Sequence, residues 1–235
     1  MNILITGTSS GLGYGLAKRY LDQGNVVYGI SRKNNEVLDA FSDFRFLSMD
    51  LNFFSSIETN IPLFLDGVSS LDLVILNAGI LNEIKDLKDT SLDEIKRVMD
   101  VNVWSNKILI DALFRLSIPI RQIVAISSGA SVSGSRGWNA YALSKATLNM
   151  LIELYSKEKT DTHFTSLAPG LIDSNMQDYI YSLGEEEKFP VLKKLRSAKG
   201  TDAMPGPEEA SIVISKGIKK AKTFKSGEFI DVRKI

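Results

Sequence analysis

The first 24 residues of the chain constrain its fold most strongly. An apolar run at residues 3–5 leads into Thr6-Gly7-Thr8-Ser9-Ser10-Gly11-Leu12-Gly13, and residues 14–21 continue with a helical pattern. This order predicts a strand, a tight turn and a helix whose N-terminus opens at the turn. The unpaired N–H groups and the positive dipole end of such a helix suit a pyrophosphate, and glycines let the anion approach the backbone. For this segment alone, a strand-to-helix turn without a ligand is the alternative.

Strand-like and helix-like segments alternate along the rest of the chain. The predicted strands are residues 3–5, 26–30, 44–47, 71–76, 123–126, 164–168 and 228–232, and the predicted helices are residues 12–23, 53–65, 92–116, 140–156 and 207–220. Apolar strands that alternate with helices are typical of a parallel sheet with helices on both faces. No Pro- or Ser-rich linker divides the chain, so we expect one Rossmann-like, doubly wound α/β domain of about seven strands over residues 1–235.

Composition argues against several classes of function. The 28 basic residues balance the 28 acidic ones, so no global field favours nucleic acid or an anionic membrane. The chain has no Cys and one His, His163, which argues against disulfides, a multi-His metal site and a Ser-His-Asp triad. We expect His163 to be structural and the protein to hold no metal. The N-terminus lacks a signal-peptide pattern and no apolar run approaches the ~20 residues of a membrane span, so we expect a cytoplasmic protein.

The residues after the second and third predicted strands bear on a cofactor. Dinucleotide-binding folds commonly place an acidic residue about 20 residues beyond the glycines, where it binds the adenosine ribose. This chain has Ser31 followed by Arg32 there. A guanidinium can bind a 2′-phosphate through two parallel hydrogen bonds, which favours NADP over NAD, and a solvated loop arginine is the alternative. Asp50, after the third strand, either accepts a hydrogen bond from an adenine amine or caps the next helix.

The chemistry, if the chain has any, lies in Ser128 and the pair Tyr141 and Lys145. Residues four apart share one face of a helix, so this Tyr and Lys point the same way. An ammonium about 4 Å from the phenol is worth roughly 4 kcal/mol at an effective dielectric of 20, enough to bring a phenol pKa from about 10 toward 7, less a desolvation penalty. The phenol would then serve as a general acid–base, and Ser128 would form a hydrogen bond with a substrate oxygen. Such a pair is common by chance, so the remaining motifs must decide.

Taken in order, the motifs resemble those of the short-chain dehydrogenase/reductase family, in its compact single-domain branch. The matching positions span nearly the whole chain: Thr6-Gly7-x-x-x-Gly11-x-Gly13, Asn77-Ala78-Gly79, Asn102, Ser128, Tyr141-x-x-x-Lys145 and Pro169-Gly170. The spacing of 13 residues from Ser128 to Tyr141 matches the family and selects Ser128 over Ser127 and Ser131. Leu76, where many relatives have Asn, and Ser174, where they usually have Thr, are mild departures.

The resemblance implies a catalytic tetrad and a cofactor site. Tyr141 would transfer the proton, Ser128 would orient the substrate oxygen, and Lys145 would lower the tyrosine pKa and hold the nicotinamide ribose. Asn102 would support Lys145 through a water in a locally bent helix, and an ordinary buried helix Asn is the alternative. The cofactor-binding residues that the resemblance implies are Gly7, Ser9, Ser10, Gly11, Leu12, Gly13, Ser31, Arg32, Asp50, Leu51, Asn77, Ala78, Gly79, Tyr141, Lys145, Pro169, Gly170, Ile172 and Ser174. Because relatives that prefer NADP often have a basic residue at the place of Ser10, the NADP preference rests on Arg32.

The resemblance also assigns residues 172–206 to a substrate lid. Its apolar residues either line a pocket or hold the lid down, and its basic run, Lys193 to Arg196, either binds an anion or is solvated. The whole connection, which includes the charged stretch Gly184 to Glu187, is expected to be mobile until ligand binds. We also expect a homodimer or homotetramer that associates through residues 92–116 and 140–156. The apolar positions expected there are Val98, Val101, Leu109, Leu113, Leu148 and Leu151, and the alternative is that all of them pack on the sheet.

The function expected from these observations is NADP(H)-dependent interconversion of a small-molecule carbonyl and an alcohol, with reduction as the preferred direction. Two alternatives stay open. One is a nucleotide-sensing regulator that uses the same fold without turnover, and the other is a sugar-nucleotide epimerase or dehydratase of the longer family branch.

Overall fold

Seven parallel strands form the central layer of the protein in a computed structural model that describes residues 1–183 and 187–235. The strands are β1 (Asn2–Thr6), β2 (Val26–Ser31), β3 (Phe44–Ser48), β4 (Leu73–Leu76), β5 (Gln122–Ile126), β6 (His163–Ala168) and β7 (Phe229–Asp231). Their order in the sheet is β3-β2-β1-β4-β5-β6-β7, and each neighbouring pair is parallel. The order reverses between β1 and β4, which confirms the predicted doubly wound sheet and marks a crevice where such sheets bind ligands.

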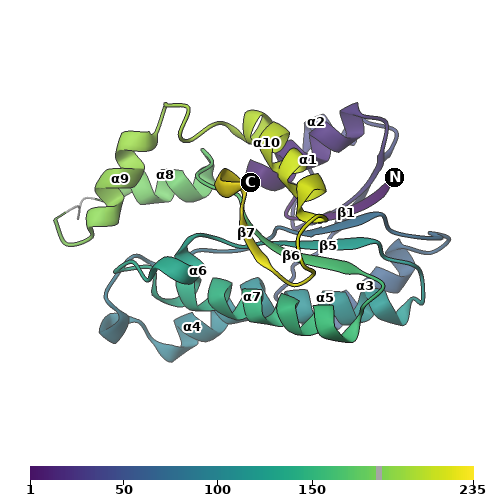
Figure 1. Ribbon diagram of the computed structural model, residues 1–235, viewed down its shortest axis with the longest axis horizontal. Helices are drawn as coiled ribbons and strands as arrows, with labels where there is room; N and C mark the ends of the chain where they lie inside the picture. Colours follow the sequence, from purple (N-terminus) through teal and green to yellow (C-terminus); the bar gives the residue numbers. More distant parts are fainter. Residues whose placement is uncertain (184–186) are drawn as a thin grey trace.

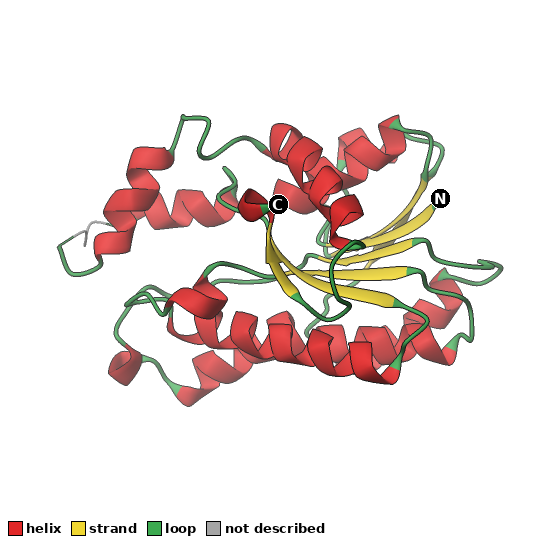
Figure 2. Ribbon diagram, in the orientation of Figure 1, coloured by secondary structure: helices red, strands yellow, loops and turns green. Residues whose placement is uncertain are grey.

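Helices cover both faces of this sheet (Figure 2). On one face lie α1 (Gly11–Asp22), α2 (Glu36–Asp39) and α10 (Pro207–Ala221), and on the other lie α3 (Phe54–Phe64), α4 (Leu92–Met99), α5 (Ser105–Arg115) and α7 (Asn139–Glu158). One helix was predicted over residues 92–116, and the structure divides this run with the π-helix η2 (Asp100–Trp104). A π turn inside a helical run is rare and often occurs at a functional site.

The remaining elements lie at the ends of the strands and beyond them. They are the short helices η1 (Leu87–Asp89), α6 (Ala130–Ser133) and η3 (Val232–Lys234), and the pair α8 (Asn175–Ser182) and α9 (Pro190–Ala198). Figure 1 shows α8 and α9 projecting together from the body of the protein, beside the C-terminus. This pair occupies the segment that was predicted to be the lid.

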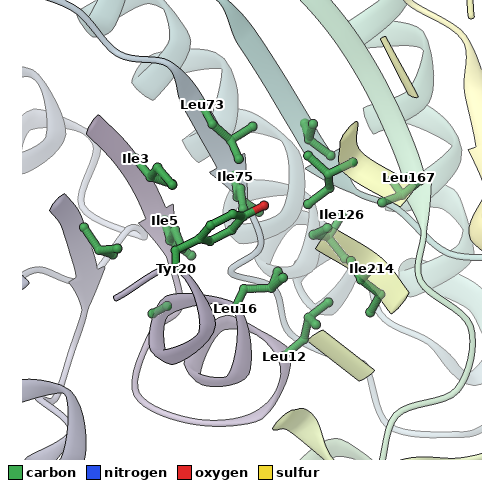
Figure 3. Packing of buried hydrophobic residues seen from close by; sticks show 14 of the residues in the cluster. Ile3, Ile5, Leu12, Leu16, Tyr20, Leu73, Ile75, Ile126, Leu167 and Ile214 are labelled. Carbon is green, nitrogen blue, oxygen red and sulfur yellow. The ribbon is translucent and has the colours of Figure 1, made fainter. Parts of the chain in front are cut away.

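Three groups of buried apolar side chains hold these layers together. The first lies between the sheet and the helices α1 and α10 and includes Ile3, Ile5, Leu16 and Ile214 (Figure 3). The second lies on the opposite face of the sheet, against α3, α5 and α7. The third, which we call the lid core, is built around Ile84, Trp138, Ile180, Phe189, Leu192, Leu195, Ala198 and Met204. The lid helices are therefore packed against the body through a core of their own.

Helix α1 approaches its neighbours more closely than a side chain would allow. A Cβ atom on Gly13 would lie 2.1 Å from the carbonyl oxygen of Gly7, and one on Gly15 would lie 2.1 Å from the carbonyl oxygen of Pro207. Heavy atoms do not pack at such distances, so an added methyl group must push the backbones apart. Gly13 thus sets the distance between α1 and the glycine turn, and Gly15 sets the distance between α1 and α10.

We expect Gly15→Ala to lower the free energy of unfolding by about 1–3 kcal/mol, because overpacking forces α1 and α10 apart. In a chain of this size each kcal/mol corresponds to roughly 2–4 °C in Tm, which a thermal unfolding experiment resolves. The sign is informative, because helix propensity alone favours Ala over Gly by about 1 kcal/mol. An equal or higher Tm would show that the contact with Pro207 does not limit the packing of these helices.

Candidate active site

One large cavity opens at the carboxyl ends of the strands and has a volume of about 1090 Å³. Nineteen of the predicted site residues line it: Gly7, Ser9, Ser10, Gly11, Leu12, Ser31, Arg32, Asp50, Leu51, Asn77, Ala78, Gly79, Ser128, Tyr141, Lys145, Pro169, Gly170, Ile172 and Ser174. Of the predicted set, Gly13 and Asn102 do not line it. His163 begins β6 at the opposite end of the sheet, where its ring is bonded to the carbonyl oxygen of Phe224.

The glycine turn presents an open helix N-terminus to this cavity. Ser10 is the N-cap residue of α1, but its side chain forms no capping hydrogen bond, and the first turn contains no acidic residue. Gly7 and Gly11 adopt φ values of 77° and 58°, which other residues rarely adopt. Ser174 lies across from the turn, its Cβ 3.6 Å from the Cβ position of Gly11. Unpaired amides, a positive dipole end and nearby hydroxyl groups fit a pyrophosphate.

Asn77 holds this turn in place from the end of β4. Its side-chain nitrogen donates to the carbonyl oxygen of Thr6 at 2.9 Å and to that of Gly7 at 3.4 Å. Its backbone N–H donates to Oγ1 of Thr6 at 2.9 Å. The same side-chain nitrogen would lie 2.5 Å from a Cβ atom on Gly13, so Gly13 and Asn77 together shape the turn from beneath.

The predicted adenosine end of the cavity lies beyond β2 and β3. The Ser31 hydroxyl donates to the carbonyl oxygen of Lys33 at 2.8 Å, which fixes the loop that carries Arg32. Among the described residues, the Arg32 guanidinium has no hydrogen-bonding or ion-pair partner. Oδ1 of Asp50 accepts from the N–H of Asn52 at 2.9 Å, and α3 begins later, so the suggested capping role for Asp50 is wrong. A free guanidinium at this end fits a phosphate.

The predicted catalytic side chains meet between β5 and α7. Nζ of Lys145 donates to the carbonyl oxygen of Ile126 at 2.7 Å and lies 5.7 Å from the centroid of the Tyr141 ring. The hydroxyl of Ser128 accepts from the N–H of Ala130 at 3.1 Å and is hydrogen-bonded to the Tyr141 phenol. The hydroxyl groups of Ser128 and Tyr141 therefore share one wall of the cavity with the buried ammonium group of Lys145.

The neighbouring serines are engaged elsewhere. Ser127 donates to Oδ1 of Asn149 at 2.6 Å, and the Asn149 amide donates to Ser131, whose hydroxyl donates to the backbone carbonyl of Ser128. This chain of hydrogen bonds fixes the backbone around Ser128, whose hydroxyl is hydrogen-bonded to the Tyr141 phenol. The catalytic role of Ser128 stays a prediction.

The pKa of the phenol moves in the direction opposite to our expectation. Burial raises the pKa of Tyr141, and the hydrogen bond from Ser128 only partly offsets it. Burial also lowers the pKa of Lys145 from 10.5 to about 8. The expected lowering assumed an ammonium about 4 Å from the phenol oxygen, whereas Nζ of Lys145 lies over the Tyr141 ring, 5.7 Å from its centroid, and is hydrogen-bonded to the carbonyl oxygen of Ile126. Desolvation therefore dominates at both groups.

Asn102 lies in η2 and is completely buried, beneath the cavity wall. Its Oδ1 accepts from the N–H of Ile80 at 2.8 Å, and its Nδ2 donates to the carbonyl oxygen of Ile80 and to Oγ of Ser144, each at 2.9 Å. The helix is locally irregular there, as expected. Asn102 thus joins the strand-end loop after Gly79 to α7, and its water-mediated support of Lys145 stays a prediction.

Asn82 is a positioning residue that the sequence analysis missed. It is 3% exposed, its Oδ1 accepts from the backbone N–H of Tyr141 at 2.8 Å, and its Nδ2 donates to the carbonyl oxygen of Glu83 at 2.6 Å. It therefore fixes the first turn of α7, on which the phenol depends. The feature of the sequence that could have pointed to Asn82 is its position three residues after the Asn77-Ala78-Gly79 motif.

The C-terminal turn and the lid also contribute residues that were not predicted. At the carboxyl end of β7 the cavity is lined by Asp231, Arg233 and Lys234. Ligands of parallel sheets bind at this end of the strands. From the lid, Met176, Gln177, Ile180, Val191, Lys194 and Leu195 line the cavity, so one member of the basic run reaches the site. Arg196 instead donates to the carbonyl oxygen of Tyr181. The expected mobile stretch, Gly184 to Glu187, falls mainly on residues 184–186, which lie outside the described residues.

Comparison with known proteins agrees with this geometry. The family model for short chain dehydrogenases matches residues 1–183. Benzil reductase ((S)-benzoin forming) of Bacillus cereus is 28% identical over 247 residues, which cover 98% of each chain. A short chain dehydrogenase/reductase structure from Saccharomyces cerevisiae has a TM-score of 0.84 at 22% identity, over 98% of this chain and 95% of that one. The structure of ElxO with NADP bound has a TM-score of 0.80 at 20% identity, over 98% and 96%.

The chain belongs to the short-chain dehydrogenase/reductase family and is an oxidoreductase that acts on carbonyl and alcohol groups of small molecules. Within the described residues, no helix is both long and apolar enough to cross a membrane.

The lowered pKa of Lys145 predicts a pH-dependent stability. Between about pH 8 and pH 10.5 the unfolded chain binds more protons at this residue than the folded chain, so the wild type gains stability as pH rises. Relative to Lys145→Met, this gain is on the order of 3 kcal/mol at most. Below about pH 8 Lys145 is protonated in both the folded and the unfolded chain, so the stability difference between the wild type and Lys145→Met no longer changes with pH.

Denaturant unfolding at several pH values between 7 and 10.5 measures this gain. Lys222→Met, at an exposed lysine after α10, is the control, and its curve should run parallel to that of the wild type. Parallel curves for Lys145→Met and the wild type would contradict the pKa of about 8.

Proposed function

We propose that the protein is an NADPH-dependent reductase that converts a ketone or aldehyde to an alcohol. The observation that carries the proposal is the shared cavity wall of Ser128, Tyr141 and Lys145, in the same cavity as Arg32. A regulator that only senses a nucleotide needs no such wall, and no observation favours that alternative.

The residues of the cavity fit the cofactor from one end to the other. The open N-terminus of α1 would hold the pyrophosphate, and Arg32, with no partner of its own, would bind the 2′-phosphate. Lys145 would donate to the nicotinamide ribose, beside the Pro169-Gly170 turn. NADP is also the ligand in the ElxO structure, which shares the fold. The bound dihydronicotinamide supplies the hydride for the reduction.

Ser128 and Tyr141 act on the oxygen of the substrate carbonyl. Ser128 donates a hydrogen bond to that oxygen and shares its developing negative charge. The Tyr141 phenol transfers its proton to the same oxygen, which completes the alcohol. Because burial raises the phenol pKa, Tyr141 is protonated at neutral pH and is ready to act as the acid, which is the role that reduction requires.

The substrate side of the cavity favours an apolar ketone. Six apolar side chains contribute to its lining: Trp138, Leu171, Met176, Ile180, Val191 and Leu195. Benzil, the substrate named for the Bacillus cereus relative, carries two phenyl rings on adjacent carbonyl groups, and such rings would be well accommodated by this lining. We therefore propose aromatic ketones and 1,2-diketones as substrates.

We also propose that the protein is a homodimer or homotetramer, although the interface differs from the expected set. Val98, Leu109, Leu113 and Leu148 are buried in the chain's own core. Other apolar side chains on these helices are exposed instead: Leu92, Trp104, Leu143, Met150 and Leu154. Burial of these side chains against a second copy would remove them from water. Both the association and a cytoplasmic location stay predictions.

Replacement of Tyr141 by Phe tests the mechanism. We expect Tyr141→Phe to abolish reduction of aromatic ketones while NADPH affinity stays within a few-fold, because the phenol proton is used only in the chemical step. Turnover is measured by NADPH absorbance and affinity by fluorescence titration. Tyr155→Phe is the matched control on the same helix, since its hydroxyl donates to Asp111 outside the cavity. The control should keep its turnover, and turnover by Tyr141→Phe would refute the mechanism.

Replacement of Arg32 tests the cofactor preference. We expect Arg32→Ala to weaken NADPH binding about tenfold to a hundredfold, because hydrogen bonds to a charged group are worth roughly 1.5–3 kcal/mol each. NADH has no 2′-phosphate and should bind the variant as well as it binds the wild type. Adding Ser31→Asp should strengthen NADH binding further. Equal weakening of both cofactors would show that Arg32 does not bind the 2′-phosphate.

A further inference from the structure

The turn after the last strand places a guanidinium group on the substrate side of the cavity. Arg233 lies in η3, and its Cδ is 3.4 Å from the Cβ position of Gly170. Its Nη2 is 3.7 Å from the Cβ position of Gly129, the residue that follows Ser128. Arg233 therefore spans the two loops between which the reacting carbonyl would lie, and it lines the same cavity as Ser128 and Tyr141.

The Arg233 side chain is held by the carboxylate of Asp231, which also caps η3. Its Nε donates to Oδ1 of Asp231 at 2.9 Å, its Nη2 donates to Oδ2, and its backbone N–H also donates to Oδ1. The Asp231 side chain is 9% exposed, whereas that of Arg233 is 59% exposed. The carboxylate is thus covered, and the cavity wall presents the guanidinium, whose Nη1 has no partner among the described residues.

The Arg233 guanidinium, held in place by Asp231, favours substrates that carry a second oxygen near the reacting carbonyl. Ser128 and Gly129 are consecutive in the chain, and the Arg233 guanidinium, 3.7 Å from the Cβ position of Gly129, lines the same cavity as Ser128. Two acceptor oxygens on adjacent carbons, as in a 1,2-dicarbonyl, match two donors on one wall of the cavity. Because Asp231 already restrains the side chain, little conformational entropy is lost when a ligand binds.

We infer that Arg233 donates to a second acceptor oxygen on the carbon next to the reacting carbonyl, and so makes 1,2-dicarbonyl compounds the preferred substrates. This inference rests on the proposed reductase function and assigns a specificity-determining residue to it. The cation at this position binds the oxygen that is not reduced, whereas Ser128 and Tyr141 act on the oxygen that is.

The test compares two ketones that differ in one oxygen. Benzil and deoxybenzoin both carry two phenyl rings and a reducible ketone, and deoxybenzoin lacks the second carbonyl. We expect Arg233→Met to lower kcat/KM for benzil about tenfold to a hundredfold and to leave kcat/KM for deoxybenzoin within about twofold. Arg233→Lys should recover part of the loss for benzil. Arg115→Met is the matched control, because Arg115 is likewise exposed and paired with a carboxylate, that of Glu58, outside the cavity.

Arg233→Met leaves Asp231 without its partner, so the double variant Arg233→Met with Asp231→Asn is measured as well. It removes the unpaired charge and should show the same selective loss for benzil. An equal loss for both ketones, an unchanged ratio, or a large fall in NADPH affinity would overturn the assignment of Arg233. If the wild type reduces neither ketone, the proposed function itself fails for this substrate class. If the wild type reduces both ketones and Arg233→Met does not change the ratio of kcat/KM for benzil to kcat/KM for deoxybenzoin, only the inference about Arg233 fails.

Discussion

The close approach of α1 to the ends of β1 and β4 is the constraint on which the rest of the site depends. Gly13 has no side chain, so the carbonyl of Gly7 and the amide of Asn77 can sit against the first turn of α1. Asn77 in turn donates to Thr6 and Gly7, which holds the glycine turn at the crevice where the strand order reverses. The open N-terminus of α1 therefore faces the cavity, and the carboxyl ends of the other strands bring their residues to the same edge.

Lys145 shows how far the site departs from what stability alone would favour. It is 4% exposed, it forms no ion pair among the described residues, and its ammonium donates to the carbonyl oxygen of Ile126. Burial costs the charged form enough to lower its pKa to about 8. A buried ammonium group lowers the stability of a protein core. It can still be retained where it has a function, here the proposed hydrogen bond to a ribose hydroxyl.

The sequence predicted the elements that local patterns determine and missed those that depend on tertiary contacts. The seven strands were recognisable because buried parallel strands are almost continuously apolar, as β4 and β5 are. The direction in which the Tyr141 pKa shifts was not recognisable, because it depends first on how deeply the fold buries the phenol. Asn82 and Arg233 act through contacts with residues 59 and 63 positions away, at Tyr141 and Gly170, and no local periodicity reports such contacts.

The proposed cofactor side and the proposed substrate side of the cavity are built from different parts of the chain, and motifs in the sequence pointed only to the first. The glycine turn, the predicted tetrad and the Pro169-Gly170 turn all lie within residues 1–183, which the family model matches. Helix α9 and Arg233, which line the cavity on its proposed substrate side, lie beyond that match. Hydride transfer requires one fixed geometry, whereas the wall that meets the rest of the substrate can differ from one enzyme to another. The lid core packs that wall against Trp138 and Tyr141, so a change of substrate preference must preserve the packing around the phenol.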